Sequence, residues 1–122
     1  MVGYVTVGTN DQDRSGKFYD ALLELFGAKR IMEIEGFVLW GTSLDDACLA
    51  VTPPFDKNPA TVGNGVMVAL RADSKEAVDA VHARALELGG ADEGAPGPRG
   101  DGFYAGYFRD LDGNKLNAFF LG

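Results

Sequence analysis

A repeat within the sequence constrains the fold of this chain more than any other feature. Residues 18–28, FYDALLELFGA, fall on residues 81–91, VHARALELGGA, and the same shift of 63 lays Val5 on Val68. In both copies an apolar run is followed by apolar residues at helical spacing, and that stretch ends at glycine. Self-similarity at a fixed spacing indicates one structural unit present twice. We therefore predict two copies of a unit that starts with a strand and a helix.

Hydrophobic periodicity and turn residues predict further strands after each helix. In the first copy we expect a strand at 3–7, a helix at 11–26, and strands at 28–35, 37–40 and 47–52. In the second copy we expect a strand at 66–70, a helix that runs to residue 88, and strands at 103–109 and 115–121. Residues 94–102 are rich in glycine and proline and are predicted to be a loop with a short strand before it. Asp73 and Glu76 are predicted to form a capping box for the second helix.

The last two strands should form a hairpin around the turn at residues 110–114, DLDGN. Aspartate side chains accept hydrogen bonds from nearby backbone N–H groups, and Gly113 or Asn114 tolerates a positive φ. After the turn, alternation places Leu116, Ala118 and Phe120 on one face, which we expect to pack against a helix. Lys115, Asn117 and Phe119 then lie on the other face, a mixture that is typical of a cavity wall.

Composition excludes several classes of function. The chain has 122 residues, 46% of them hydrophobic, and a net charge of −7, which fits one soluble globular domain. Lysine and arginine form no cluster, so neither nucleic acid nor an acidic membrane is an expected partner. The single cysteine excludes an internal disulfide and fits a reducing compartment, and no signal segment or membrane-spanning run is present. We predict a cytoplasmic protein.

The segment RDLDGNKLN at residues 109–117 resembles the closing hairpin of the vicinal oxygen chelate superfamily. This superfamily includes glyoxalase I, bleomycin-resistance proteins and extradiol dioxygenases. Residues 15–20, SGKFYD, and the two-copy register agree with the resemblance. It implies an α+β fold in which two tandem βαβββ modules form an incomplete curled β-barrel. The single domain would cover residues 1–122, with module one at about 1–56, a loop at 57–64 and module two at about 65–122. Relatives often pair, and an incomplete barrel leaves strand edges exposed, so a homodimer is expected.

The same resemblance implies where a metal would bind. In metal-dependent relatives, ligands come from positions that correspond here to Tyr4, Met67 and Asn117. A fourth ligand comes from the strand at 47–52, which offers only Cys48 and Thr52. A phenol, a thioether and a carboxamide are poor ligands for the divalent metals that these relatives use. We therefore predict no metal and no other cofactor.

The interior of the predicted cup is then a mostly apolar pocket with a few polar groups, which is the composition of a small-molecule site. The alternative is that these side chains fill the barrel. Arg99, in the glycine-rich segment, is suited to holding a carboxylate or phosphate, or else is exposed or paired with Asp101. Trp40 either stacks on a ligand or belongs to the core. The candidate ligand-binding residues are Tyr4, Thr6, Trp40, Met67, Arg99, Tyr104, Asn117 and Phe119.

The leading functional hypothesis is a glyoxalase- or bleomycin-resistance-like protein that binds a small organic molecule without a metal. The alternative is a metal-independent lyase or isomerase in which Tyr4 is catalytic and Asn117 and Arg99 hold an oxyanion. A metal-dependent lactoylglutathione lyase is the third reading. The only histidine, His82, is predicted to be a surface or boundary residue.

Overall fold

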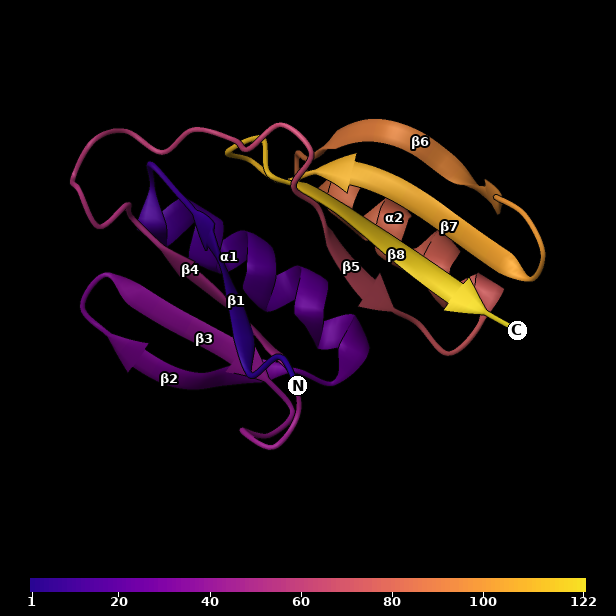
Figure 1. Ribbon diagram of the computed structural model, residues 1–122, viewed down its shortest axis with the longest axis horizontal. Helices are drawn as coiled ribbons and strands as arrows, with labels where there is room; N and C mark the ends of the chain where they lie inside the picture. Colours follow the sequence, from indigo (N-terminus) through magenta and orange to yellow (C-terminus); the bar gives the residue numbers. More distant parts are fainter. The chain divides into compact units, whose positions relative to one another are not determined.

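The computed structural model describes all residues, 1–122, and divides into two compact units, Met1–Val62 and Gly63–Gly122 (Figure 1). The boundary falls inside the loop expected at 57–64. Each unit contains one four-stranded sheet and one long helix. The repeat in the sequence therefore corresponds to two copies of one α+β module.

The first unit follows the predicted order of elements. They are β1 (Tyr4–Gly8), α1 (Gln12–Leu23), the 3-10 turn η1 (Glu24–Phe26), β2 (Lys29–Ile34), β3 (Phe37–Gly41) and β4 (Cys48–Thr52). The strand order in the sheet is β1-β4-β3-β2, with β1 parallel to β4 and the other pairs antiparallel. Asp11 caps α1 by accepting a hydrogen bond from the Arg14 N–H at 3.0 Å. Gly27 follows η1 with φ of 72°, a conformation that glycine adopts without strain.

One face of this sheet packs against α1. The Trp40 ring lies 5.7 Å from the Tyr19 ring of α1, and its indole N–H donates to Asp20 Oδ1 at 2.9 Å. Val38 and Val51 share this face and are almost completely buried. Apolar burial against the helix is the main favourable term in the stability of such a unit. We call the opposite face, which points away from α1, the distal face of the first unit.

The second unit repeats this arrangement. Its elements are β5 (Val68–Arg71), α2 (Lys75–Glu87), β6 (Ala91–Pro98), β7 (Phe103–Arg109) and β8 (Lys115–Leu121), and the strand order is β5-β8-β7-β6. Figure 1 shows α2 behind β7 and β8, covering one face of the sheet. Leu116 and Ala118 are fully buried on that face, as alternation predicted. We call the face that points away from α2 the distal face of the second unit.

Three local expectations for this unit were wrong. The strand β6 occupies Ala91–Pro98, where we expected mostly loop; its glycines and prolines are tolerated because β6 is an edge strand with two register shifts. Ser74, and not Asp73, caps α2, by accepting from the Ala77 N–H at 3.0 Å. His82 is only 6% exposed, because it faces the sheet beside Phe108.

The hairpin turn has the predicted chemistry. Asp110 is 5% exposed, and its Oδ1 accepts from the backbone N–H groups of Asp112 and Asn114, each at 2.9 Å. Gly113 takes the positive φ, at 90°. The turn fixes the register in which Arg109 pairs with Lys115, and therefore Tyr107 with Asn117. Neither helix of the protein is both long enough and apolar enough to cross a membrane.

Candidate functional site

The eight predicted ligand-binding residues fall on different faces. Trp40 and Tyr104 lie on the helix-covered faces of their sheets. Tyr4 and Thr6 lie on the distal face of the first unit, and Asn117 and Phe119 lie on the distal face of the second. Met67 immediately precedes β5 and is 40% exposed. A site that joins residues of both units stays a prediction.

The positions of Trp40 and Tyr104 do not support a role in ligand binding. Trp40 is 1% exposed beneath α1. Tyr104 donates its hydroxyl to Asp79 Oδ1 of α2 at 2.7 Å, and this hydrogen bond to the carboxylate is the main cause that raises the pKa of the phenol. Trp40 therefore contacts α1 and Tyr104 contacts α2, so each side chain packs between a helix and its sheet.

Tyr4 is 55% exposed on the edge strand β1, and its ring packs edge-on against Phe37 at 6.0 Å. Thr6 is also exposed and is paired with Ala50 of β4. Behind them, Leu39, Cys48 and Ala50 form a small buried cluster with Ile31 and Phe37. The catalytic role of Tyr4 stays a prediction.

Asn117 is the most informative polar residue of the second unit. It lies on the inner strand β8, is 1% exposed, and its side-chain oxygen Oδ1 has no hydrogen-bond partner within the protein. Its neighbours across the sheet are Tyr107 on β7 and Ala69 on β5. A buried carbonyl without a partner loses its hydration without compensation, at a cost of roughly 1–3 kcal/mol. Such a group calls for a donor supplied from outside the chain.

Two cationic side chains lie beside the Tyr107 ring. The Arg99 guanidinium carbon is 5.6 Å from the ring centroid and the Lys115 ammonium nitrogen is 5.5 Å from it. Arg99 also donates to the backbone carbonyls of Ala95 at 2.6 Å and Pro98 at 3.3 Å, and it forms no ion pair with Asp101 or any other carboxylate. Arg99 therefore lies back against β6 instead of extending into solvent.

A third cation on this face is already neutralised. Arg109 donates to Glu93 Oε1 at 2.6 Å, and this hydrogen bond is the main cause that lowers the pKa of the Glu93 carboxyl. At the other end of the face, the Phe103 and Phe119 rings stack with centroids 5.4 Å apart. On the distal face of the second unit, Asn117 thus lies between Arg99, Lys115 and Arg109 at one end and the Phe103–Phe119 stack at the other, where Arg71 of β5 pairs with Phe119.

The comparison with known families follows the same division into two modules. A family model described as the Glyoxalase/Bleomycin resistance protein/Dioxygenase superfamily matches residues 1–118. The chain belongs to this superfamily. No curated protein matches the chain in sequence.

Solved structures match all or nearly all of the chain. A glyoxalase/bleomycin resistance protein from Albidiferax ferrireducens T118 is 37% identical, with a TM-score of 0.92 over 100% of this chain and 99% of that one. TnmS3, an antibiotic binding protein from Streptomyces sp. CB03234, is 25% identical, with a TM-score of 0.72 over 100% and 96% of the two chains. A lactoylglutathione lyase from Agrobacterium tumefaciens is 21% identical, with a TM-score of 0.70 over 98% and 92%, and shows likeness of fold alone. The predicted glyoxalase/bleomycin-resistance fold is therefore confirmed.

The residues at the superfamily's metal positions do not fit a divalent metal. At the positions that the resemblance implies for the metal ligands, Asn117 offers one neutral carbonyl oxygen, and Tyr4 and Met67 offer a phenol and a thioether. No three His, Cys, Asp or Glu side chains come together in an arrangement that could hold a metal ion.

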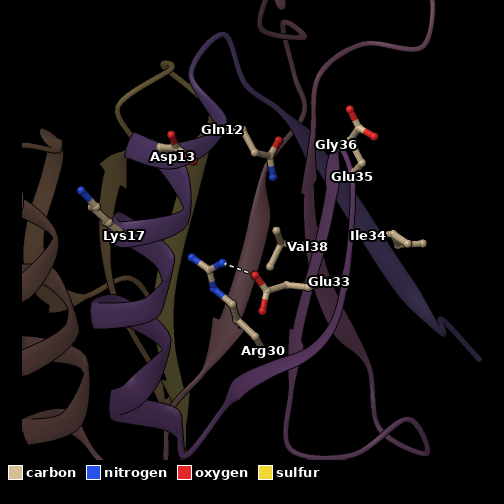
Figure 2. Close-up of a pocket in the computed structure, with 9 residues that line it drawn as sticks. All are labelled: Gln12, Asp13, Lys17, Arg30, Glu33, Ile34, Glu35, Gly36 and Val38. Carbon is tan, nitrogen blue, oxygen red and sulfur yellow. Dashed lines mark hydrogen bonds and ion pairs between the residues drawn. The ribbon is translucent and has the colours of Figure 1, made fainter.

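A separate hollow of about 560 Å³ lies in the first unit, between α1 and the strands β2 and β3 (Figure 2). Arg30 is one of the residues that line it, and its donors already have partners: it donates two hydrogen bonds to Asp20, at 2.8 and 2.9 Å, and one to Glu33 at 2.9 Å. Burial acts to raise the pKa of the Asp20 carboxyl, but the hydrogen bonds from Arg30 and Trp40 outweigh it, and the pKa lies below the ordinary 3.8. None of the eight predicted residues lines this hollow.

Tyr107 was missed as a site residue, and Lys115 was expected on the cavity wall with Asn117 but was not among the eight candidates. Alternation showed that Tyr104 and Tyr107 point to opposite faces, but it did not show which of them shares a face with Asn117. The hairpin turn carries that signal: a turn that pairs residue 109 with residue 115 also pairs residue 107 with residue 117.

Proposed function

We propose that this protein binds a small organic molecule, without a metal ion, on the distal face of the second unit. The observation that supports it most directly is the buried, unpartnered carbonyl oxygen of Asn117. The resemblance of the last hairpin implies that this amide takes the place of a metal-binding glutamate of metal-dependent relatives, and a neutral amide recognises a donor group instead of a cation.

The surroundings of Asn117 support binding of an organic molecule. Tyr107, Phe103 and Phe119 provide aromatic surface for an apolar body. Arg99 and Lys115 provide polar groups that orient a ligand. The likeness to TnmS3, an antibiotic binding protein, shows that this fold serves for ligand binding in one relative.

A fragment screen by ¹H–¹⁵N NMR on chelator-treated protein tests the proposal. Bound fragments are expected to shift the Asn117 side-chain amide and the backbone amides of β7 and β8. Asn117→Ala should weaken the binding of such a fragment about tenfold, because one hydrogen bond to a buried carbonyl is lost. Asn64→Ala, at an exposed position of the same unit, is the matched control and should change nothing.

Two outcomes would overturn the proposal. One is fragment binding that maps only to the hollow of the first unit. The other is binding at β8 that Asn117→Ala leaves unchanged.

A further inference from the structure

We propose that the ligand of this face is an organic anion with three parts in a fixed order. A carboxylate or similar oxyanion is held by Arg99 and Lys115, an apolar body packs on Phe103 and Phe119, and an N–H or O–H donor between them reaches Asn117. The inference rests on the proposed function and adds the chemical class of the ligand.

Arg99 is held in place for this role. A guanidinium carries five N–H donors, and two of those of Arg99 go to the carbonyls of Ala95 and Pro98. A Cβ added at Gly97 would lie 3.1 Å from a guanidinium nitrogen, so this glycine leaves space for the Arg99 side chain across β6. The remaining donors are fixed without a carboxylate partner. A cation fixed before binding loses less conformational entropy when an anion arrives.

The charge around Tyr107 is positive although the chain as a whole is acidic. Arg99 and Lys115 converge on the Tyr107 ring, and Arg109 lies directly opposite Lys115, two residue pairs further along the hairpin than Tyr107. The carboxylate that faces this group is Glu93, which is bonded to Arg109 and also attracts Lys115. Arg71 of β5, paired with Phe119, is a fourth cation on this face. Four cations against one carboxylate leave excess positive charge on this face of a chain whose net charge is −7. An anion is attracted here, and a cationic ligand is repelled.

The order of side chains along β8 sets the order of groups in the ligand. Lys115, Asn117 and Phe119 follow one another on the distal face, and two residues of a strand span about 7 Å. Tyr107 and Asn117 are direct cross-strand neighbours. The side-chain oxygen of Asn117 therefore lies between the pair Arg99 and Lys115 on one side and the Phe103–Phe119 stack on the other. An N-acyl amino acid has this order: carboxylate, amide N–H, apolar acyl group.

Four probe molecules test separately whether the ligand needs an oxyanion and an N–H donor. Hippurate (N-benzoylglycine) carries all three parts. N-benzoylglycinamide removes the charge, and N-benzoylsarcosine keeps the charge but removes the N–H donor. Benzamidomethylphosphonate replaces the planar carboxylate with a tetrahedral oxyanion and shows which anion the cations prefer. Affinities are measured by titration calorimetry, and the site is mapped by ¹H–¹⁵N NMR.

We expect hippurate to bind at least about tenfold more tightly than either analogue. N-benzoylglycinamide loses the charge-assisted hydrogen bonds of the carboxylate, and N-benzoylsarcosine loses the N–H bond to the buried oxygen of Asn117. Arg99→Gln and Lys115→Gln should each weaken hippurate binding about tenfold and change binding of the neutral amide by less than about twofold. Lys29→Gln, which removes one positive charge at an exposed position on β2, is the matched control and should leave both affinities unchanged.

The outcomes separate the class of ligand from the proposed function. If the neutral N-benzoylglycinamide binds at Asn117 as tightly as hippurate and benzamidomethylphosphonate do, the inference of an anionic ligand is wrong and the proposed function stands. Equal binding of hippurate by wild type and Arg99→Gln would also overturn the inference. If no probe, charged or neutral, perturbs Asn117, the proposed function fails with it.

Discussion

At the scale of single residues, Asn117 lowers the stability of the fold, because its buried side-chain oxygen has no hydrogen-bond partner in the protein. The residue is 1% exposed, and its buried side-chain oxygen has no partner among apolar and aromatic neighbours on three strands. Proteins often carry such costs at binding sites. The same residue should therefore limit stability and enable binding.

Asn117→Leu is expected to test this combination. Leucine has the same branching as asparagine with larger end groups, so the change removes an unsatisfied buried polar group without emptying the site, and the free energy of unfolding should change by no more than about 1 kcal/mol. Ligand binding should be lost. Urea unfolding measures the first effect. A fall of several kcal/mol would mean that Asn117 has a structural partner, contrary to the site described here.

Asp20 predicts a pH dependence within the first unit. Its folded pKa is depressed below 3.8 by Arg30 and Trp40, against the effect of burial. The ionised carboxylate therefore contributes stability that is present above the unfolded pKa and is lost as the pH falls through the folded pKa. We expect Asp20→Asn to destabilise the protein at about pH 6 and to do so less at about pH 3.

Urea unfolding of wild type and Asp20→Asn across this range checks the prediction, with Glu35→Gln at an exposed turn as the control. A destabilisation by Asp20→Asn that is the same at both pH values would show that the pair of Asp20 with Arg30 is not the cause.

At the scale of elements, the position of a helix cap is decided by a single residue. Ser74 has the extended backbone of a cap residue and accepts from the Ala77 N–H, whereas Asp73 lies one position before it. Ser74→Ala should lower the free energy of unfolding by about 1 kcal/mol, and Asp73→Ala should have a smaller effect. Chemical unfolding of the two variants decides between them. A larger loss for Asp73→Ala would restore the capping box that the sequence suggested.

The elements also show where sequence reasoning succeeds and where it stops. The turn residues of the last hairpin and the Asp11 cap act through local chemistry, so the sequence predicts them well. Trp40 lies in a strand whose residues are nearly all buried, so no alternation reveals its face. The strand β6 was not predicted because its glycines and prolines have low strand propensity. They are tolerated there because β6 lies at the edge of its sheet.

At the scale of the whole molecule, membership of a superfamily with metal-dependent enzymes does not carry their chemistry over to this chain. The positions of Tyr4, Met67 and Asn117 lack the donors for a divalent metal. We therefore expect no turnover of the hemithioacetal of methylglyoxal and glutathione, with or without added nickel, zinc, manganese or iron. Absorbance of the thioester product measures it. Turnover that rises with added metal, and is lost in Asn117→Ala, would contradict this expectation.

The central claim is that this protein recognises an organic molecule without the help of a metal. The most direct measurement is the affinity of chelator-treated protein for hippurate, or for the best fragment of the screen, before and after adding each of the four metals. We predict the same dissociation constant in every case, with Asn117→Ala weakening binding equally throughout. Binding that appears only when a metal is added, with one metal ion retained per chain, would contradict the account.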